Sequence, residues 1–214
     1  YDNPWWQVVA TRDAFVQPTR WLRADWTNIA LDSAIVLFAG HLASTRTRPF
    51  LLAAFVAGLI GVATAIAGTE FTRNVLLTSI QLWRTQWILH FLAVGMLPFV
   101  IHGLWKAPGT GRATAALLVT AFVSVRYPGS LGAILLALGM HLGTGRGLKL
   151  SAFTERTLFI VCALAIIAAV VAQFNLWIVA NPELLGSGLF GNDIEPSAQL
   201  SSLNIAARIV SYPL

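Results

Sequence analysis

Arginine is the residue type whose placement in this chain most suggests binding chemistry. Six arginines lie beside apolar segments, at the ends that the charge pattern described below assigns to the outer face of a membrane. A guanidinium group binds phosphate or carboxylate through two parallel hydrogen bonds, so these residues suit a diphosphate group. The alternative is ordinary snorkelling and ion pairing at the membrane surface. The six are Arg12, Arg20, Arg23, Arg73, Arg84 and Arg126.

Carboxylates at the same predicted level are candidates for acid–base chemistry. Asp13 and Asp25 precede the first long apolar segment, and Asp32 lies inside it. An ionisable residue within a membrane segment is a candidate functional residue, because its burial in lipid is costly. Asp32 is therefore a candidate general base toward an acceptor hydroxyl, with Asp25 and Asp13 as alternatives. Equally, Asp32 is a candidate buried ion-pair partner for Arg126 or another outer arginine.

The four histidines and the single cysteine argue against a bound metal or haem. His90 and His102 share one apolar segment, but they are separated by about 120° around a helix, and His90 has no histidine partner at its predicted depth. Hydrogen bonding at the interface or between helices is the expected role of these side chains. Cys162 alone supports neither an intrachain disulfide nor a cysteine-based metal site. We identify no cofactor.

Composition places these residues in a membrane protein. Of 214 residues, 57% are hydrophobic and only 11% are charged, whereas about a quarter of an average soluble domain is charged. Mean hydropathy is +0.71. These values exclude a soluble globular domain, a disordered chain and a nucleic-acid-binding module. The lipid bilayer is the expected surrounding, and the net charge of +5 serves to set orientation in it.

The apolar runs predict an all-α polytopic bundle with four full spans and one short helical hairpin. A span needs about 20 mostly apolar residues, and 28–44, 50–67, 87–104 and 158–180 approach that length. The runs 113–125 and 131–142 are too short, and Pro128-Gly129 between them is a strong turn signal. We therefore expect a hairpin over 113–142, either re-entrant or placed where the bilayer is thin.

A separate amphipathic helix is predicted over about 72–86. Leu76, Ile80 and Trp83 follow the spacing of one helical face, and Arg73 and Arg84 flank that face. Such a helix is expected to lie in the outer interface before the third span begins.

Charge density sets the predicted orientation. The short linkers 45–49, 105–112 and 143–156 are densely basic and are assigned to the cytoplasm. The segments 1–27, 68–86, 126–130 and 181–214 are assigned to the outside. Most tryptophans lie at the predicted outer ends, where indole rings anchor a protein at the headgroups or stack on a sugar or lipid headgroup.

Three parts follow from this layout. An outer N-terminal segment covers 1–27, a transmembrane bundle covers 28–180, and an outer C-terminal segment covers 181–214. The chain begins without methionine and ends within a plausible helix, so we expect it to be a piece of a longer protein. The small-residue face of 50–67, which includes Gly58 and Gly61, predicts close helix packing.

The layout resembles bacterial inner-membrane enzymes that handle polyprenyl-linked sugars, namely GT-C-type glycosyltransferases and O-antigen polymerases and ligases. The shared features are short dipping helices, outer arginines and an outer helix carrying Gln81-Leu82-Trp83-Arg84. The resemblance implies that outer arginines hold a lipid diphosphate and that a carboxylate or histidine activates the acceptor. By position, Arg73, Arg84 and Arg126 would bind the diphosphate and Trp83 the substrate, with Asp13, Asp25 or Asp32 as base. Such enzymes usually have more spans and an acidic motif in their first outer loop.

Two other functions remain open. A non-catalytic scaffold or accessory subunit would bind lipids and pack beside other membrane subunits. A haem-binding or transport module is the least favoured, since transport favours paired intramembrane charges and inverted repeats.

Overall fold

The computed structural model describes residues 6–8, 17–144 and 150–180. Residues 181–214, the predicted C-terminal segment, lie outside the described residues, as do 1–5 and 9–16 of the predicted N-terminal segment. Every regular element in the described part is helical. In chain order these are η2 (Pro18–Arg20), α2 (Arg23–Leu42), α3 (Arg48–Ile66), η3 (Ala67–Phe71), α4 (Val75–Ile80), η4 (Leu82–Arg84), α5 (Thr85–Lys106), α6 (Gly111–Val123), α7 (Gly129–Thr144) and α8 (Ala152–Ala180).

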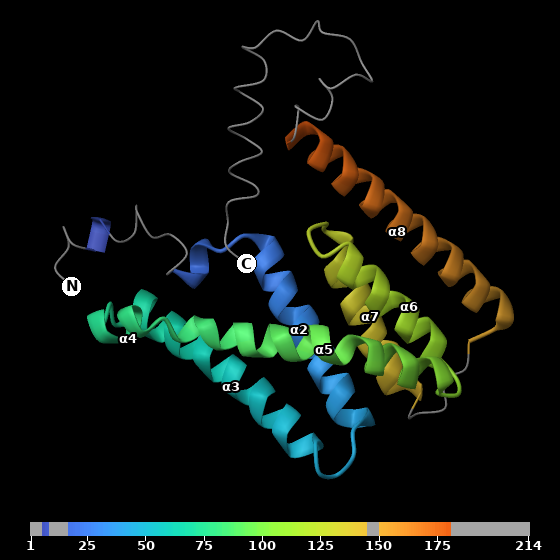
Figure 1. The fold of residues 1–214 in the computed structure, drawn as a ribbon, viewed down its shortest axis with the longest axis horizontal. Helices are drawn as coiled ribbons and strands as arrows, with labels where there is room; N and C mark the ends of the chain where they lie inside the picture. The colour runs from blue at the N-terminus through green and yellow to red at the C-terminus, as the bar shows by residue number, and fades with distance from the viewer. Residues whose placement is uncertain (1–5, 9–16, 145–149, 181–214) are drawn as a thin grey trace, which may run out of the picture. The chain divides into compact units, whose positions relative to one another are not determined.

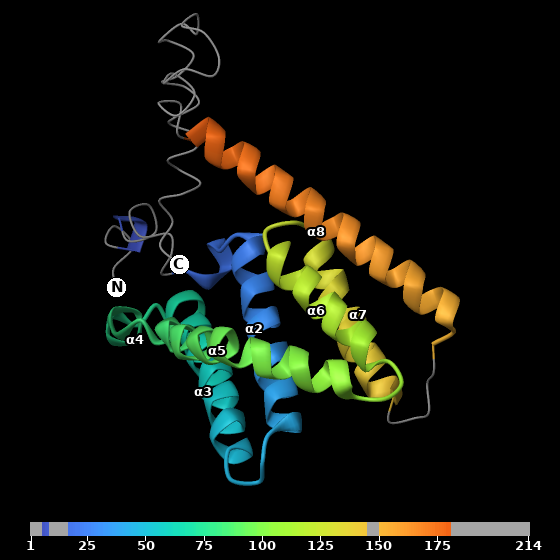
Figure 2. The same cartoon turned by 45° about the vertical axis from the view of Figure 1, so that its right-hand side comes forward.

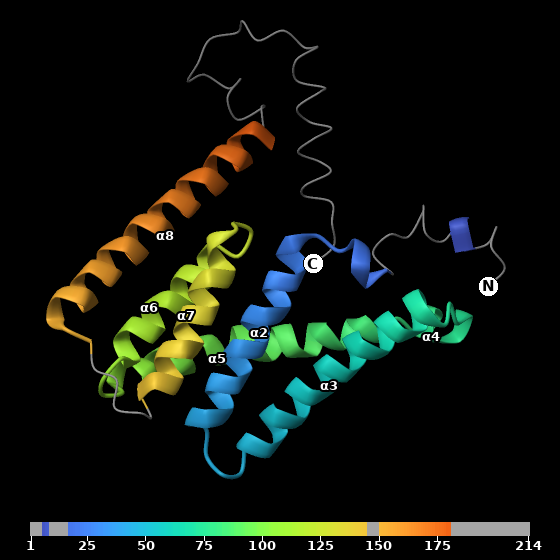
Figure 3. The same ribbon diagram turned by 180° about the vertical axis from the view of Figure 1, so that it is seen from behind.

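Helix α2 lies at the centre of the bundle. It contacts α3, α5, α6 and α7, and Figures 1 and 3 show it between α3 and the α6–α7 pair, with α5 crossing it. Its side chains Ile35, Val36 and Ala39 are fully buried. The chain up to Ala163 forms one compact unit, and the remainder of α8 begins a second.

Three helical stretches are long and apolar enough to cross a membrane: Arg48–Phe71, Leu76–Lys106 and Ala152–Val179. They correspond to three of the four predicted spans. Helix α2, the fourth, is not among them because Asn28, Asp32 and His41 lower its hydropathy. Its contacts with four other helices explain how these polar side chains are accommodated, since they need not all face lipid.

The prediction of a short helical hairpin is confirmed at the level of helices. Helices α6 and α7 pack side by side and are joined by a turn at 124–128 (Figure 2). In this turn the Tyr127 N–H donates to the Ser124 carbonyl at 2.8 Å. At the open end, Thr110 Oγ1 donates to the carbonyl of Met140 at 3.0 Å. The Pro128-Gly129 signal therefore marks the bend, with α7 beginning at its glycine.

The prediction of one continuous helix over 72–86 is wrong. Arg73 and Gln81 both have left-handed backbone conformations, with φ of 46° and 54°. A left-handed residue breaks the repeat of an α-helix, so the segment consists of the separate short helices α4 and η4. Asn74 caps α4 by accepting a hydrogen bond from the Leu77 N–H at 3.1 Å. The placement of this segment in the outer interface stays a prediction.

Close packing at the predicted glycine face is confirmed. An added Cβ at Gly61 would lie 2.6 Å from the carbonyl oxygen of Leu82, and one at Gly58 would lie 3.3 Å from Nε2 of Gln86. The Gln86 side chain donates from Nε2 to the carbonyl of Gly58 at 2.7 Å. Small residues on α3 therefore let η4 and the start of α5 approach its backbone.

Candidate functional site

The central feature of the candidate site is a carboxylate–imidazole pair between α2 and α5. Nδ1 of His90 lies 3.0 Å from Oδ2 and 3.2 Å from Oδ1 of Asp32. The Asp32 side chain is only 8% exposed, whereas that of His90 is 43% exposed. With the proton on Nδ1, the ring donates to the carboxylate and Nε2 is left as a proton acceptor. This arrangement is the usual one for a carboxylate that orients a histidine base.

Asp32 therefore has a different partner from the arginine that the sequence suggested. Arg126 is exposed on the turn between α6 and α7, and the expected Arg126–Asp32 pair is not formed. His90 is closer because α2 and α5 pack directly against each other, whereas Arg126 lies in a turn at the end of a different pair of helices. The expectation that histidines hydrogen-bond between helices is confirmed for His90.

Four tryptophans and one arginine gather where η2, α2, η4 and α5 meet. The ring centroids of Trp21 and Trp26 are 5.5 Å apart, those of Trp21 and Trp83 are 5.9 Å apart, and those of Trp83 and Trp87 are 6.4 Å apart. The Arg84 guanidinium lies over the rings of Trp83 and Trp87, at 5.6 and 5.5 Å from their centroids. We call these five residues the indole–Arg84 cluster.

Cation–π interaction attracts a guanidinium to the face of an indole, and the guanidinium carries five N–H donors. Arg84 is exposed, so these donors are open to an anion. Trp83 and Arg84, two predicted substrate-binding residues, therefore lie together. Tryptophan clustering at one end of the bundle agrees with the predicted aromatic belt.

The cluster and the Asp32–His90 pair follow one another along both helices. His90 comes three residues after Trp87 on α5, and Asp32 comes six residues after Trp26 on α2. Residues three apart are neighbours on a helix surface, and six residues rise about 9 Å. The exposed, cationic aromatic cluster thus precedes the half-buried base His90 by less than one turn on α5, and precedes Asp32 by about one and two-thirds turns on α2.

Other predicted site residues have separate positions. Arg73 lies over the Trp6 ring, 5.8 Å from its centroid. Asp25 caps α2, with Oδ2 accepting from the Leu22 N–H at 2.8 Å, which is a structural role. Asp13 lies outside the described residues.

His90 is the residue that sequence reasoning did not assign to the site. Asp32 is the fifth residue of the apolar segment 28–44, and His90 is the fourth of 87–104. Both segments were predicted to begin at the outer face, so the two residues lie at nearly equal depth. Counting residues from the segment ends could have paired them.

A second histidine pair joins the C-terminal end of α2 to α7. The rings of His41 and His141 have centroids 4.9 Å apart, and Phe38 lies at the same distance from His141. In the part of the chain that the structure describes, no group of three or more His, Cys, Asp or Glu residues is arranged to hold a metal ion. The rings of His41 and Phe38 each pack edge-on against that of His141.

No protein-family model, curated protein or solved structure matches this chain.

Proposed function

We propose that this chain is the membrane portion of a bacterial inner-membrane enzyme that transfers or polymerises sugars from a polyprenyl-diphosphate donor at the outer face. The observation that carries the proposal is that the indole–Arg84 cluster comes shortly before the Asp32–His90 pair along both α2 and α5. One group can accept a proton and the other can hold a diphosphate, and glycosyl transfer needs both.

In this proposal His90 is the base and Asp32 is its orienting partner. Nε2 of His90 takes the proton of the acceptor hydroxyl as its oxygen attacks the anomeric carbon of the donor sugar. Asp32 holds the ring through Nδ1 and stabilises the imidazolium that forms. The bond between the anomeric carbon and the diphosphate oxygen breaks, and the lipid diphosphate leaves with the bonding electrons.

Arg84 is the proposed phosphate ligand. Its guanidinium, held over two indoles, offers paired N–H donors to the leaving diphosphate, whose charge increases during the reaction. Arg73 is a second cation of the same segment, and Trp83 offers an indole face to the sugar. Arg126, exposed on the hairpin turn, is a less direct candidate for the same role.

The test uses the full-length protein in cells that encode it, with lipid-linked sugars and finished polysaccharide measured by mass spectrometry. His90→Gln should lower turnover by at least about a hundredfold, the usual contribution of a positioned base. Asp32→Asn should lower it in the same direction, and Arg84→Gln should weaken donor binding. The matched control is His41→Gln, which replaces an exposed histidine on α2 away from the pair. Wild-type product levels in His90→Gln would refute the catalytic role.

A non-catalytic scaffold or accessory subunit is the second candidate. Two observations favour it. Asp32 contacts His90 and Arg84 contacts Trp83, so both side chains have partners within the protein. Neither residue lines the surface groove on α5 that is described in the next subsection. For this function, Asp32 and His90 variants should leave polysaccharide chemistry intact while the recovery of partner subunits with the purified protein decreases.

A further inference from the structure

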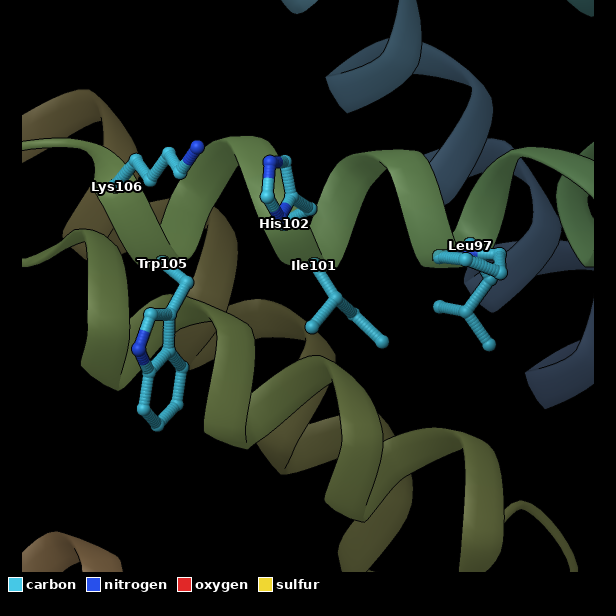
Figure 4. A pocket seen from close by; sticks show the side chains of 6 residues that line it. Leu97, Ile101, His102, Trp105 and Lys106 are labelled. Carbon is cyan, nitrogen blue, oxygen red and sulfur yellow. The ribbon is translucent and has the colours of Figure 1, made fainter.

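Beyond the candidate site, the far half of α5 carries a surface groove of about 600 Å³. Two rows of side chains, each with a four-residue spacing, border it, as expected for neighbouring ridges on a helix. Figure 4 shows His102 and Lys106 on one side of the α5 ribbon and Ile101 and Trp105 on the other. The groove is lined by Leu97, Pro98, Ile101, His102, Trp105 and Lys106.

The groove changes from apolar to cationic along its length. Leu97, Pro98 and Ile101 line one end, and His102 and Lys106 line the other. None of the six lining residues is acidic. The nine steps from Leu97 to Lys106 rise about 14 Å along a helix, close to half of the roughly 30 Å hydrocarbon core of a bilayer. The groove therefore has the length and polarity of one leaflet.

Trp105 lies at the cationic end and is held from a second helix. Its ring packs edge-on against Phe159 of α8, with centroids 5.8 Å apart. Glu155 and Arg156 lie four and three residues before Phe159, so an acid and a cation share this side of α8. Indole rings prefer the headgroup level, and the linker that begins at Trp105 is one of those assigned to the cytoplasm.

We propose that this groove binds one phospholipid with an anionic headgroup from the cytoplasmic leaflet. One acyl chain lies along Leu97 and Ile101, and the headgroup phosphate receives hydrogen bonds from Lys106 and His102. Charge complementarity supports this occupant, because basic pockets beside membrane helices on the cytoplasmic side select anionic lipids. A zwitterionic lipid would fill the apolar part equally well but would not gain from the cationic end.

The test reads Trp105 fluorescence in vesicles. The protein is reconstituted in phosphatidylcholine containing a minor fraction of either brominated phosphatidylglycerol or brominated phosphatidylcholine, whose bromine atoms quench indoles that they contact. Subtracting the signal of Trp105→Phe from that of the wild type isolates Trp105 among the eight tryptophans. Each further variant is measured as a pair with and without Trp105→Phe.

The wild type should prefer phosphatidylglycerol over phosphatidylcholine at Trp105 by about fivefold, the ratio expected from one basic side chain near the surface. Lys106→Gln should reduce the ratio toward one, and Lys106→Arg should retain it, which separates loss of charge from misfolding. Arg48→Gln, an exposed arginine at the start of α3, is the matched control and should leave the ratio unchanged.

Three results would overturn the proposal. The first is equal quenching by the two lipids in the wild type, which would mean ordinary solvation by lipid. The second is an unchanged ratio in Lys106→Gln. The third is complete relief of quenching by excess soluble glycerol phosphate, which would mean recognition of phosphate without a lipid chain. None of these readouts depends on glycosyl transfer.

Discussion

Nδ1 of His90 lies 3.0 Å from Oδ2 of Asp32 and so connects α5 to the central helix α2. The carboxylate is the buried member of the pair and the imidazole is half-exposed. A buried carboxylate is costly unless it has a hydrogen-bonding partner, and His90 supplies one. The contact therefore stabilises the packing of α2 on α5 while leaving Nε2 of the ring for other chemistry.

A double-mutant cycle should detect this coupling. Asp32→Asn, His90→Gln and the double variant are compared by unfolding of the detergent-solubilised protein. We expect a coupling free energy of roughly 0.6 kcal/mol, the average for polar contacts between membrane helices, and at most about 1.7 kcal/mol. Additive effects of the two substitutions would show that the two side chains do not interact in the folded protein.

Gly61 should tolerate no side chain. A Cβ there would be 2.6 Å from the Leu82 carbonyl oxygen, so Gly61→Ala must push η4 and the start of α5 away from α3. We expect the free energy of unfolding to fall by about 1–3 kcal/mol, as for overpacking in a core.

Gly95→Ala on α5 is the control, because a Cβ there meets nothing within 4 Å. It should be neutral or stabilising by up to about 1 kcal/mol, since alanine favours helix. Equal melting temperatures for the two variants would contradict the packing.

The regular elements follow closely from the sequence, for identifiable reasons. Segment length and hydropathy suffice for α3, α5 and α8, because a membrane helix satisfies its own backbone hydrogen bonds. Pro128-Gly129 suffices for the bend between α6 and α7. Hydropathy placed α2 as a span, but its contacts with four other helices emerge only from the tertiary structure.

The break in the segment 72–86 was not predictable from its pattern. Leu76, Ile80 and Trp83 keep helical spacing across Gln81, yet Gln81 itself is left-handed. Glutamine has no intrinsic preference for that conformation, so no local signal marks the break. The candidate site was half predicted: Arg84, Trp83 and Asp32 were chosen by charge and depth, whereas His90 required knowledge of which helix faces Asp32.

Gln86 should contribute to stability through its amide. Its Nε2 donates to the Gly58 carbonyl at 2.7 Å, and its residue is buried between α3 and α5. Gln86→Leu keeps much of the volume and removes this donor, so we expect a loss of roughly 0.6–1.7 kcal/mol. The Gly58–Gln86 contact also predicts that Gly58→Ala and Gln86→Leu are not additive, since both alter one contact. Unfolding measurements on the two single variants and the double variant would check this, and strict additivity would count against a shared contact.

The two linkers that flank the α6–α7 hairpin should lie on one side of the membrane. Helices α6 and α7 form a hairpin, so the chain must return to the side from which it entered, and residues 107 and 151 should be accessible from the same side. The sole cysteine, Cys162, is replaced by serine, and single cysteines are then introduced at Thr47, Ala107, Ser151 and Phe71. An impermeant maleimide on intact cells should label the Phe71→Cys variant, because Phe71 lies in the segment assigned to the outside, between two helical stretches long and apolar enough to cross a membrane. The other three variants should be labelled only after permeabilisation, because the density of basic residues in their linkers predicts that they face the cytoplasm.

Arg126→Cys adds a test of hairpin depth, because the thirteen residues of α6 rise only about 20 Å against a hydrocarbon core of roughly 30 Å. We expect slow labelling of that position from outside, through a thinned or water-filled region.

For the two linkers, labelling of residues 107 and 151 from opposite sides of the membrane would be incompatible with the hairpin.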